Sequence, residues 1–308
     1  MHMTLQQLKL FEAVTRNNSF TLAARELELS QPAVSIQIKR LENQAGMPLF
    51  EQLGKKIFPT LAGKLMYDAS QDILQRVEQL KTDMEELNGK VKGKLNLSVV
   101  TTTKYFLPRI LGNFLNDYPD VEPRLNFTNR AQVIERLYNN KDDLVILGQI
   151  PEDNNLQSYP FMENQLVVVA PPDHPLATQK DIELELLSEE RIIEREQGSG
   201  TRLMFDNLLE NKDFTVKTYM ELGSSEAVKQ AVIAKLGIAV LSLHSVRHEL
   251  ESKRLCILDV KGFPIKSRWY IVHLKSLQLS LVARTFLDFI LKSTKTLDSS
   301  EATIAIQE

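Results

Sequence analysis

Near the start of the chain, the polar side chains that could contact another molecule lie in a segment with helical periodicity, directly after Ser30. Ser30 is suited to cap a helix, Pro32 falls in its first turn and Gly46 ends it, so we expect a helix reaching about residue 44. The apolar residues that can face a core are Ala33, Val34, Ile38 and Leu41. The side chains left to face outward include Gln31, Ser35, Gln37, Lys39 and Arg40. Amides and hydroxyls near a helix N-terminus, followed by cations, suit a helix that enters the major groove of DNA.

A second short helix is expected just before this one, with Thr21 placed to cap its N-terminus. Its apolar stripe consists of Leu22, Ala23, Leu27 and Leu29. Together the two segments predict a helix-turn-helix within residues 20–50. Pairs of amphipathic helices with a polar outer face also occur in proteins that never touch nucleic acid, so periodicity alone leaves both interpretations open.

A short basic turn follows the two helices. Gly54 and two adjacent lysines, Lys55 and Lys56, lie between the extended apolar segments 49–51 and 58–60. This arrangement is typical of a wing, and both ammonium groups are placed to reach DNA phosphates.

Residues 4–64 resemble the winged helix-turn-helix of LysR-type transcriptional regulators. The family's pattern is carried by Leu8, Phe11, Ala23-Ala24, Leu29 to Ser35, Ile38, Leu41-Glu42, Gly46, Pro48 to Phe50, Thr60 and Ala62-Gly63. Gln52 and Pro59 depart from it, standing where an arginine and an aliphatic residue are usual. The residues that we expect to contact promoter DNA are Thr21, Gln31, Pro32, Ser35, Gln37, Lys39, Arg40, Lys55 and Lys56.

Composition fits this architecture. The chain has 308 residues, more than one hydrophobic core usually spans, so two or three domains are expected. The formal net charge is −3, but residues 1–64 hold 8 Lys and Arg against 5 Asp and Glu and are therefore basic.

No apolar run is long enough for a membrane span, and the N-terminus does not read as a signal peptide, so we expect a cytoplasmic protein. The one cysteine, Cys256, excludes an intramolecular disulfide and is expected to be a buried apolar residue.

A heptad pattern dominates the next segment, in which almost nothing breaks a helix between Thr60 and Gly89. Its apolar residues are spaced alternately four and three apart, and they are Ile73, Val77, Leu80, Met84, Leu87 and Val91. We expect residues 65–92 to form a linker helix roughly 45 Å long that pairs with a second copy, giving a homodimer or a homotetramer. The alternative is a single helix lying against its own domain.

Short apolar runs alternate with helical patterns after residue 93, which predicts an α/β domain with largely parallel sheets. The expected strands are 95–100, 122–127, 143–147, 165–170, 191–193, 217–222, 238–241, 254–258 and 266–272. The expected helices are 107–116, 131–138, 202–209, 225–235 and 279–291. The resemblance implies a two-lobed, periplasmic-binding-protein-like effector domain at 93–293, with lobe I at 93–163 and 269–293 and lobe II at 164–268. Residues 294–308 are expected to form a flexible polar tail.

Polar residues gather where strands lead into helices, a position suited to binding an anion or another polar ligand. They lie in the segments 101–103, 129–130, 148–149 and 197–202. The residues that we expect to contact an effector are Thr101, Thr102, Thr103, Asn129, Gln149, Thr201 and Arg202. Each of them also fits an ordinary role at a helix start, and only their joint placement favours a ligand site.

This half of the chain is similar to one branch of the family, the regulators of Calvin-cycle carbon-fixation operons. The similarity lies in residues 101–109, Asp143-Leu144, Gly148 and Pro151-Glu152. The resemblance implies a phosphorylated sugar, an organic acid or a nicotinamide nucleotide as effector. Gln149-Ile150 replaces the expected Arg-Pro, which removes one cation and weakens the case for a strongly anionic ligand.

An enzyme is the main competing class. The sequence contains no GxSxG, P-loop or HExxH motif, so we predict no catalytic residue. His244 and His248 could share a helix face as metal ligands, but without further ligands nearby we expect surface residues and no metal or cofactor. A binding module without a regulatory role is the other alternative. The expected partners are promoter DNA, a second copy, a small effector and RNA polymerase, with no membrane.

Overall fold

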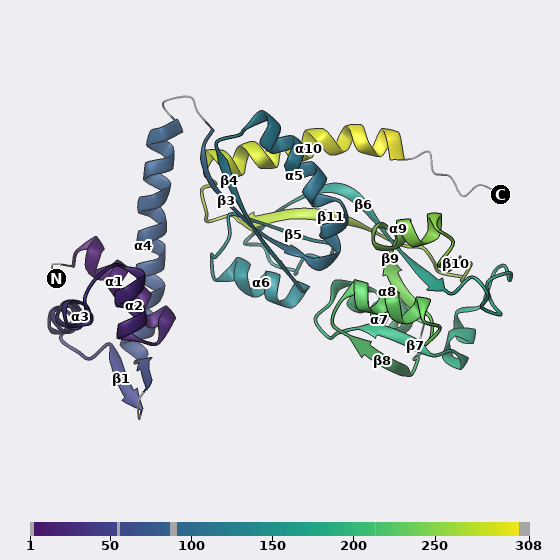
Figure 1. Ribbon diagram of the computed structural model, residues 1–308, viewed down its shortest axis with the longest axis horizontal. Helices are drawn as coiled ribbons and strands as arrows, with labels where there is room; N and C mark the ends of the chain where they lie inside the picture. Colours follow the sequence, from purple (N-terminus) through teal and green to yellow (C-terminus); the bar gives the residue numbers. More distant parts are fainter. Residues whose placement is uncertain (1–2, 54–55, 87–90, 213, 302–308) are drawn as a thin grey trace. The chain divides into compact units, whose positions relative to one another are not determined.

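The computed structural model describes residues 3–53, 56–86, 91–212 and 214–301 (Figure 1). The chain divides into two compact units, Met1–Gly89 and Lys90–Glu308. No helix in the described ranges is long and apolar enough to cross a membrane.

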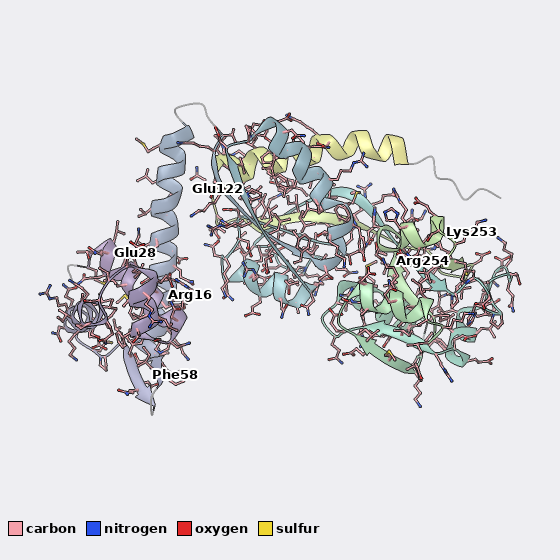
Figure 2. All side chains as sticks on the ribbon, in the orientation of Figure 1. Arg16, Glu28, Phe58, Glu122, Lys253 and Arg254 are labelled. Atoms are coloured by element: carbon pink, nitrogen blue, oxygen red, sulfur yellow. The ribbon has the colours of Figure 1, made fainter. Side chains whose placement is uncertain are left out.

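The first unit is a small helical domain with a two-stranded wing. Its elements are α1 (Leu5–Asn17), α2 (Phe20–Glu26), α3 (Gln31–Ala45), β1 (Phe50–Leu53), β2 (Lys56–Pro59) and α4 (Leu61–Glu86). Phe11 is fully buried and packs 5.0 Å from the ring of Phe50, which joins α1 to the start of the wing. Strand β2, which carries Phe58 on the wing (Figure 2), pairs antiparallel with β1. The predicted winged helix-turn-helix is therefore confirmed.

Hydroxyl caps fix where the helices of this unit begin. The Ser30 hydroxyl accepts from the backbone N–H of Ala33 at 3.4 Å, and Gly46 ends α3 in the left-handed region at φ 72°, as the sequence predicted. The prediction that Thr21 caps α2 was wrong. Ser19 has the extended backbone of a cap and accepts from Leu22 N–H at 3.3 Å, so α2 is already helical at Thr21.

Helix α4 begins at Leu61, where its first turns pack on α1 through Met66 and Tyr67. Further along, three residues of the predicted seam are open to solvent: Ile73 is 41%, Leu80 58% and Met84 59% exposed. Leu87 lies outside the described residues. The placement of Val91 on this helix was wrong, because α4 ends at Glu86 and Val91 packs against a hydrophobic core of the second unit.

The second unit is built on a seven-stranded sheet in the order β10-β6-β11-β5-β3-β4, with β9 paired to β6. Its strands are β3 (Gly93–Val100), β4 (Val121–Thr128), β5 (Leu144–Leu147), β6 (Leu156–Ala170), β9 (Ala239–Ser242), β10 (Cys256–Leu258) and β11 (Ile265–Leu274). Only β3 pairs in parallel, with β4 and with β5. Every pairing of β6 or β11 is antiparallel, so the prediction of largely parallel sheets was wrong for this part. The reason is that the chain enters the second lobe along β6 and returns to the first along β11, so these two neighbouring strands run in opposite directions.

Helices cover this sheet and complete two lobes (Figure 1). In the first lobe they are α5 (Leu107–Asp117), α6 (Arg130–Tyr138) and α10 (Leu281–Glu301). Phe114 of α5 and Phe286 of α10 are fully buried and pack against each other. In the second lobe the helices are α7 (Gly200–Glu210), α8 (Ser225–Ile233) and α9 (Leu243–Glu251), with the parallel strands β7 (Ile192–Arg195) and β8 (Thr218–Leu222). Two 3-10 turns, η1 (Thr101–Tyr105) and η2 (Leu184–Glu189), complete the unit.

The two-lobed α/β fold class is confirmed, with three local differences. Strand β6 begins at Leu156, well before its predicted start. Helix α9 was not predicted, and α10 continues to Glu301 in a segment that we expected to be a tail.

A close backbone contact at Gly237 generates the first prediction. A Cβ atom there would lie 2.1 Å from the carbonyl oxygen of Arg191, which accepts a hydrogen bond from Ile238 N–H at 2.9 Å. We expect Gly237→Ala to lower the free energy of unfolding by about 1 to 3 kcal/mol, because β9 and β7 must move apart. Gly112→Ala is the matched control, since Gly112 lies in α5 with nothing within 4 Å, and it should be neutral or stabilising by about 0.5 to 1 kcal/mol. Urea unfolding measures both, and equal losses would contradict the prediction.

Candidate DNA-binding face and effector cleft

Helix α3 presents most of the predicted DNA-contacting side chains on one open face. Gln31, Pro32, Lys39 and Arg40 are exposed and Ser35 is half-exposed, while Val34, Ile38 and Leu41 are buried on the opposite side. The Gln31 amide nitrogen donates to the Ser35 hydroxyl at 2.8 Å, so these two side chains are held together at the helix N-terminus. The face therefore offers amide, hydroxyl and cationic groups in that order along the helix.

The remaining predicted DNA residues are placed as follows. Thr21 is exposed on α2 and Gln37 is half-buried on α3. Lys56 begins β2, and Lys55 lies outside the described residues. Lys39 forms an ion pair with Glu42 at 3.4 Å. Because the Lys39 side chain is exposed to solvent, this ion pair contributes little to the stability of the protein. Glu42 also accepts from Leu49 N–H at 2.9 Å, so it positions the start of the wing.

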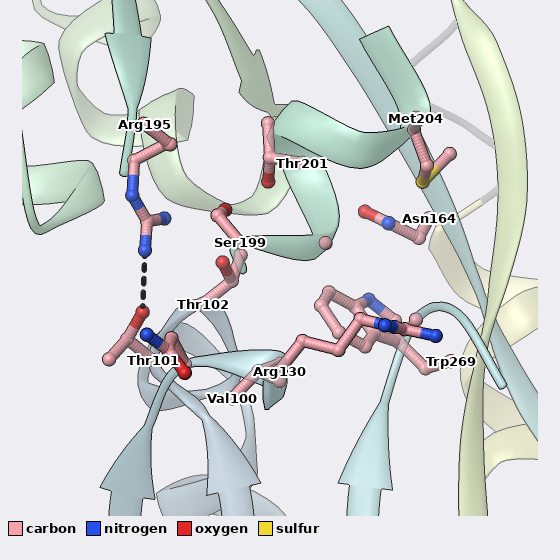
Figure 3. Close-up of a pocket in the computed structure, with 13 residues that line it drawn as sticks. Val100, Thr101, Thr102, Arg130, Asn164, Arg195, Ser199, Thr201, Met204 and Trp269 are labelled. Atoms are coloured by element: carbon pink, nitrogen blue, oxygen red, sulfur yellow. Dashed lines mark hydrogen bonds between the residues drawn. The ribbon is translucent and has the colours of Figure 1, made fainter. Parts of the chain in front are cut away.

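A narrow cleft lies between the two lobes of the second unit, and its empty space, counted together with the open mouth, is about 390 Å³ (Figure 3). Lobe I contributes residues at the carboxyl ends of β3, β4 and β5, and lobe II contributes the start of α7. The lining residues are Val100, Thr101, Thr102, Asn129, Arg130, Gly148, Asn164, Arg195, Ser199, Gly200, Thr201, Met204 and Trp269.

Four of the predicted effector residues line this cleft: Thr101, Thr102, Asn129 and Thr201. Thr101, Thr102 and Asn129 lie there because the parallel strands β3 and β4 end at one edge of the sheet, with a 3-10 turn or a helix following each. Thr201 lies there because α7 begins on the opposite lobe. The Asn129 side chain caps α6 by accepting from Gln132 N–H at 3.0 Å. The Ser199 hydroxyl makes no such cap bond to α7.

Three other predicted residues do not line the cleft. Thr103 is fully buried, and its hydroxyl donates to the Val100 carbonyl at 2.8 Å, because the η1 turn directs it into the lobe. Gln149 contributes its backbone carbonyl, which accepts from the Arg130 Nε at 2.9 Å. Arg202 turns toward carboxylates instead, and its partners are Glu194, Asp206 and Glu221.

Two arginines supply the positive charge of the cleft. Arg195, at the end of β7, is 4% exposed, and its guanidinium donates to the Ser225 hydroxyl at 2.6 Å and to the Thr101 hydroxyl at 3.4 Å. Figure 3 marks the bond to Thr101, which joins the lobes. Arg195 also pairs with Glu196 at 2.8 Å, which offsets part of its charge.

Arg130 carries a less compensated charge. It opens α6, and among the described residues no carboxylate lies within ion-pair distance of its guanidinium. Burial lowers the pKa of Arg130, since desolvation disfavours the charged form. An arginine still remains protonated at neutral pH, so an anion in the cleft would meet a partly buried cation.

Arg130 lies in a polar segment predicted from the sequence, whereas Arg195, Asn164 and Trp269 were not predicted to line the cleft. All three of these lie within β-strands, where a polar or aromatic residue gives no positional signal. Asn164 is 3% exposed and bonds to Ser242 at 2.8 Å and Ser267 at 3.1 Å. Trp269 is also 3% exposed, and no described residue accepts a hydrogen bond from its indole N–H.

A second set of contacts joins the lobes beside the cleft. The Tyr105 hydroxyl, at the end of η1, donates to Glu226 on α8 at 3.1 Å. Lys229 is 4% exposed, pairs with Glu226 at 2.9 Å and Glu249 at 3.1 Å, and lies 5.2 Å from the centre of the Tyr105 ring. Burial opposes ionisation of Glu226, but hydrogen bonds from Lys229, Gln230 and Tyr105 outweigh it and hold its pKa at about 2. Glu226 therefore stays ionised at neutral pH.

The two histidines of α9 have different surroundings. The His244 Nε2 lies 3.0 Å from the Glu163 carbonyl and its ring is 5.3 Å from Phe106, whereas His248 is highly exposed beside Glu251. No group of three or more His, Cys, Asp or Glu side chains suited to a metal ion occurs in the part of the chain that the structure describes. Cys256 is half-buried and its thiol contacts the Ala170 carbonyl at 3.5 Å.

Comparison with known proteins assigns both units. Residues 5–64 match the family described as bacterial regulatory helix-turn-helix protein, lysR family, and residues 88–295 match the LysR substrate binding domain. The chain is 47% identical over 289 residues to a RuBisCO operon transcriptional regulator of Acidithiobacillus ferrooxidans, with 94% of each chain covered. It is 46% identical over 287 residues to the HTH-type transcriptional activator CmpR of Synechocystis, covering 93% of this chain and 94% of that one.

One solved structure gives the same assignment for the second unit, and another shows the fold. The regulatory domain of Synechocystis CcmR in complex with 2-PG matches with a TM-score of 0.64 and 46% identity, covering 67% of this chain and 99% of that chain. A full-length OxyR variant from Pseudomonas aeruginosa matches with a TM-score of 0.73 and 20% identity, covering 96% of this chain and 95% of that chain, which is a likeness of fold.

The Tyr105 contact generates the second prediction. Tyr105→Phe removes a hydroxyl that bridges the lobes, and we expect it to lower the free energy of unfolding by about 1 kcal/mol. The control is Tyr138→Phe, because the Tyr138 hydroxyl donates to Asp153 at 2.7 Å within lobe I at a more exposed position, and its loss should cost less. Urea titrations of both variants provide the comparison. A Tyr105→Phe protein as stable as wild type would show that the contact does not hold the lobes together.

Proposed function

The chain belongs to the LysR family of bacterial transcriptional regulators, and from this premise we propose that it controls carbon-fixation genes in response to a small anion bound between its lobes. The regulator class follows from the match of both units. The pathway is supported by relatives named as RuBisCO operon regulators, at up to 47% identity over almost the whole chain. A regulator of this kind would work in the cytoplasm, where bacterial promoters are.

One observation carries the proposed ligand class. Arg130 and Arg195 both line the cleft, and Arg130 has no carboxylate partner among the described residues. The loss of a cation at position 149, which weakened the case for an anion in the sequence, is therefore compensated by Arg130 and Arg195. A relative's regulatory domain has been solved with 2-PG at 46% identity, which makes 2-PG the first ligand to test here.

The lobes give this ligand a way to act. Thr101, Thr102 and Asn129 approach from lobe I, and Arg195 and Thr201 approach from lobe II. A ligand that contacts both sides stabilises one relative arrangement of the lobes over others, and it shifts the equilibrium only by that difference in affinity.

DNA recognition is assigned to α3 and the wing. Gln31, Pro32, Ser35 and Gln37 are proposed to face base edges, with Lys39 and Arg40 on the groove wall. Thr21, Lys55 and Lys56 are proposed to contact phosphates and to position the domain. RNA polymerase is a further proposed partner, since one close relative is named as an activator.

The third prediction compares the 2-PG affinity of variants at Arg130, which has no carboxylate partner among the described residues, and at Arg202, which has three. Arg130→Ala should weaken 2-PG binding at least tenfold, because the loss of a charge-assisted hydrogen bond costs about 1.5 to 3 kcal/mol. Arg202→Ala is the matched control, since Glu194, Asp206 and Glu221 already neutralise its charge outside the cleft, and it should bind 2-PG nearly as wild type does. Isothermal calorimetry on the full chain measures both.

The same proteins test regulation. Footprinting on carbon-fixation promoters should show protection that 2-PG alters in wild type and in Arg202→Ala but not in Arg130→Ala. If the protein protected only promoters of unrelated genes, the proposal that it controls carbon-fixation genes would be refuted. Equal 2-PG affinity in all three proteins would refute the ligand site.

The fourth prediction concerns assembly, for which we propose that a second copy covers the exposed seam of α4. Replacing both Leu80 and Met84 by Lys would place like charges across that interface and should lower the oligomeric state. Asp72→Lys adds a cation at an outward heptad position and serves as the control. Sedimentation velocity should distinguish them, and an unchanged assembly in the double variant would rule out pairing through this helix.

A further inference from the structure

An exposed apolar side chain occupies the middle of the DNA-binding face. Ile36 lies on α3 and is 54% exposed, although the other residues on that face carry amide, hydroxyl or charged groups or are proline. The sequence pattern did not single it out, because an isoleucine in an amphipathic helix is ordinarily expected in the core.

Helical geometry places Ile36 opposite the buried side. It is two residues from Val34, which is fully buried, and two residues from Ile38, which is 3% exposed. At about 100° per residue, Ile36 therefore points roughly 160° away from each of them around the helix. Pro32, Lys39 and Arg40 are its neighbours one turn away on the exposed side.

Neither stability nor solubility accounts for this side chain. Isoleucine is a weaker helix former than most straight-chain residues, and its exposure leaves apolar surface in water. The core of the first unit is complete without it, since Leu41, Val34 and Ile38 fill the side of α3 that packs on α1 and α2. A single exposed apolar residue is common on protein surfaces, but here it lies at the centre of the face assigned to DNA.

The major groove offers one apolar group that distinguishes bases, the C5-methyl of thymine. We propose that Ile36 contacts a thymine methyl in each half-site and so specifies an A·T pair beside the bases that Gln31 and Ser35 read. This rests on the proposed function of α3 as the recognition helix. Isoleucine has no donor or acceptor side-chain atom, so it adds specificity only through that methyl contact. Cytosine and uracil lack the methyl group and would leave the side chain without its partner.

The test removes the methyl from the DNA and the side chain from the protein. Binding sites are first selected from a random DNA library with the full-length protein, and each thymine of the selected site is then replaced singly by deoxyuridine. One replacement per half-site should weaken wild-type binding by about threefold to fivefold, the equivalent of burying one methyl group. Ile36→Ala should bind the thymine site more weakly and should show no further loss with deoxyuridine at that position.

Lys39→Ala is the matched control, because Lys39 shares the exposed face but offers a cation. It should weaken binding and keep the full deoxyuridine effect. The proposal is overturned if no thymine methyl affects wild-type binding, or if the deoxyuridine effect survives in Ile36→Ala. A protein that enriches no sequence at all would overturn the assignment of α3 as recognition helix, and this proposal with it.

Discussion

The antiparallel pairing of β6 with β11 is the constraint on which the effector domain depends. These two strands pair from Ile265 opposite Leu166 to Leu274 opposite Leu156, and they run through both lobes. Their register shifts between Trp269 and Tyr270, and Trp269 and Asn164 both line the cleft from this strand pair. Bulges of this kind bend a strand and redirect its side chains. The base of the cleft is therefore formed by the same two strands that connect the lobes.

The proposed coupling between ligand binding and lobe arrangement rests on a few contacts that join the lobes at the cleft. Arg195 lines the cleft and donates to hydroxyls on both lobes, Thr101 and Ser225. Ser225 begins the helix that carries Glu226 and Lys229, while Thr101 begins the turn that ends at Tyr105. Any anion that attracts the Arg195 guanidinium competes with these hydroxyls. The occupancy of the cleft therefore bears directly on the contacts that hold the lobes.

The sequence predicted the parts of this fold that rest on local chemistry. Apolar runs located the strands, and Ser30 and Gly46 bounded α3. Thr101 and Asn129 marked two strand ends at which the cleft forms, and Thr201 marked the helix start that faces them. The antiparallel sheet was missed because pairing depends on where the chain crosses between lobes, which periodicity does not record. The cleft cation was assigned to Arg202, beside a glycine-rich helix start, instead of Arg195. Only the fold reveals that Arg202 faces three carboxylates and that Arg195 faces the cleft.

The central claim is that an anion between the lobes changes DNA binding. Trp269 is the one tryptophan of the chain and lies in the cleft, so its fluorescence reports on that site alone. The decisive measurement is a titration of the full-length protein on fluorescently labelled promoter DNA with 2-PG, following tryptophan emission and DNA anisotropy together. The account predicts that both signals change with the same midpoint and that Arg130→Ala shifts both midpoints to higher concentration. A change in DNA binding without a change in Trp269 emission would contradict it.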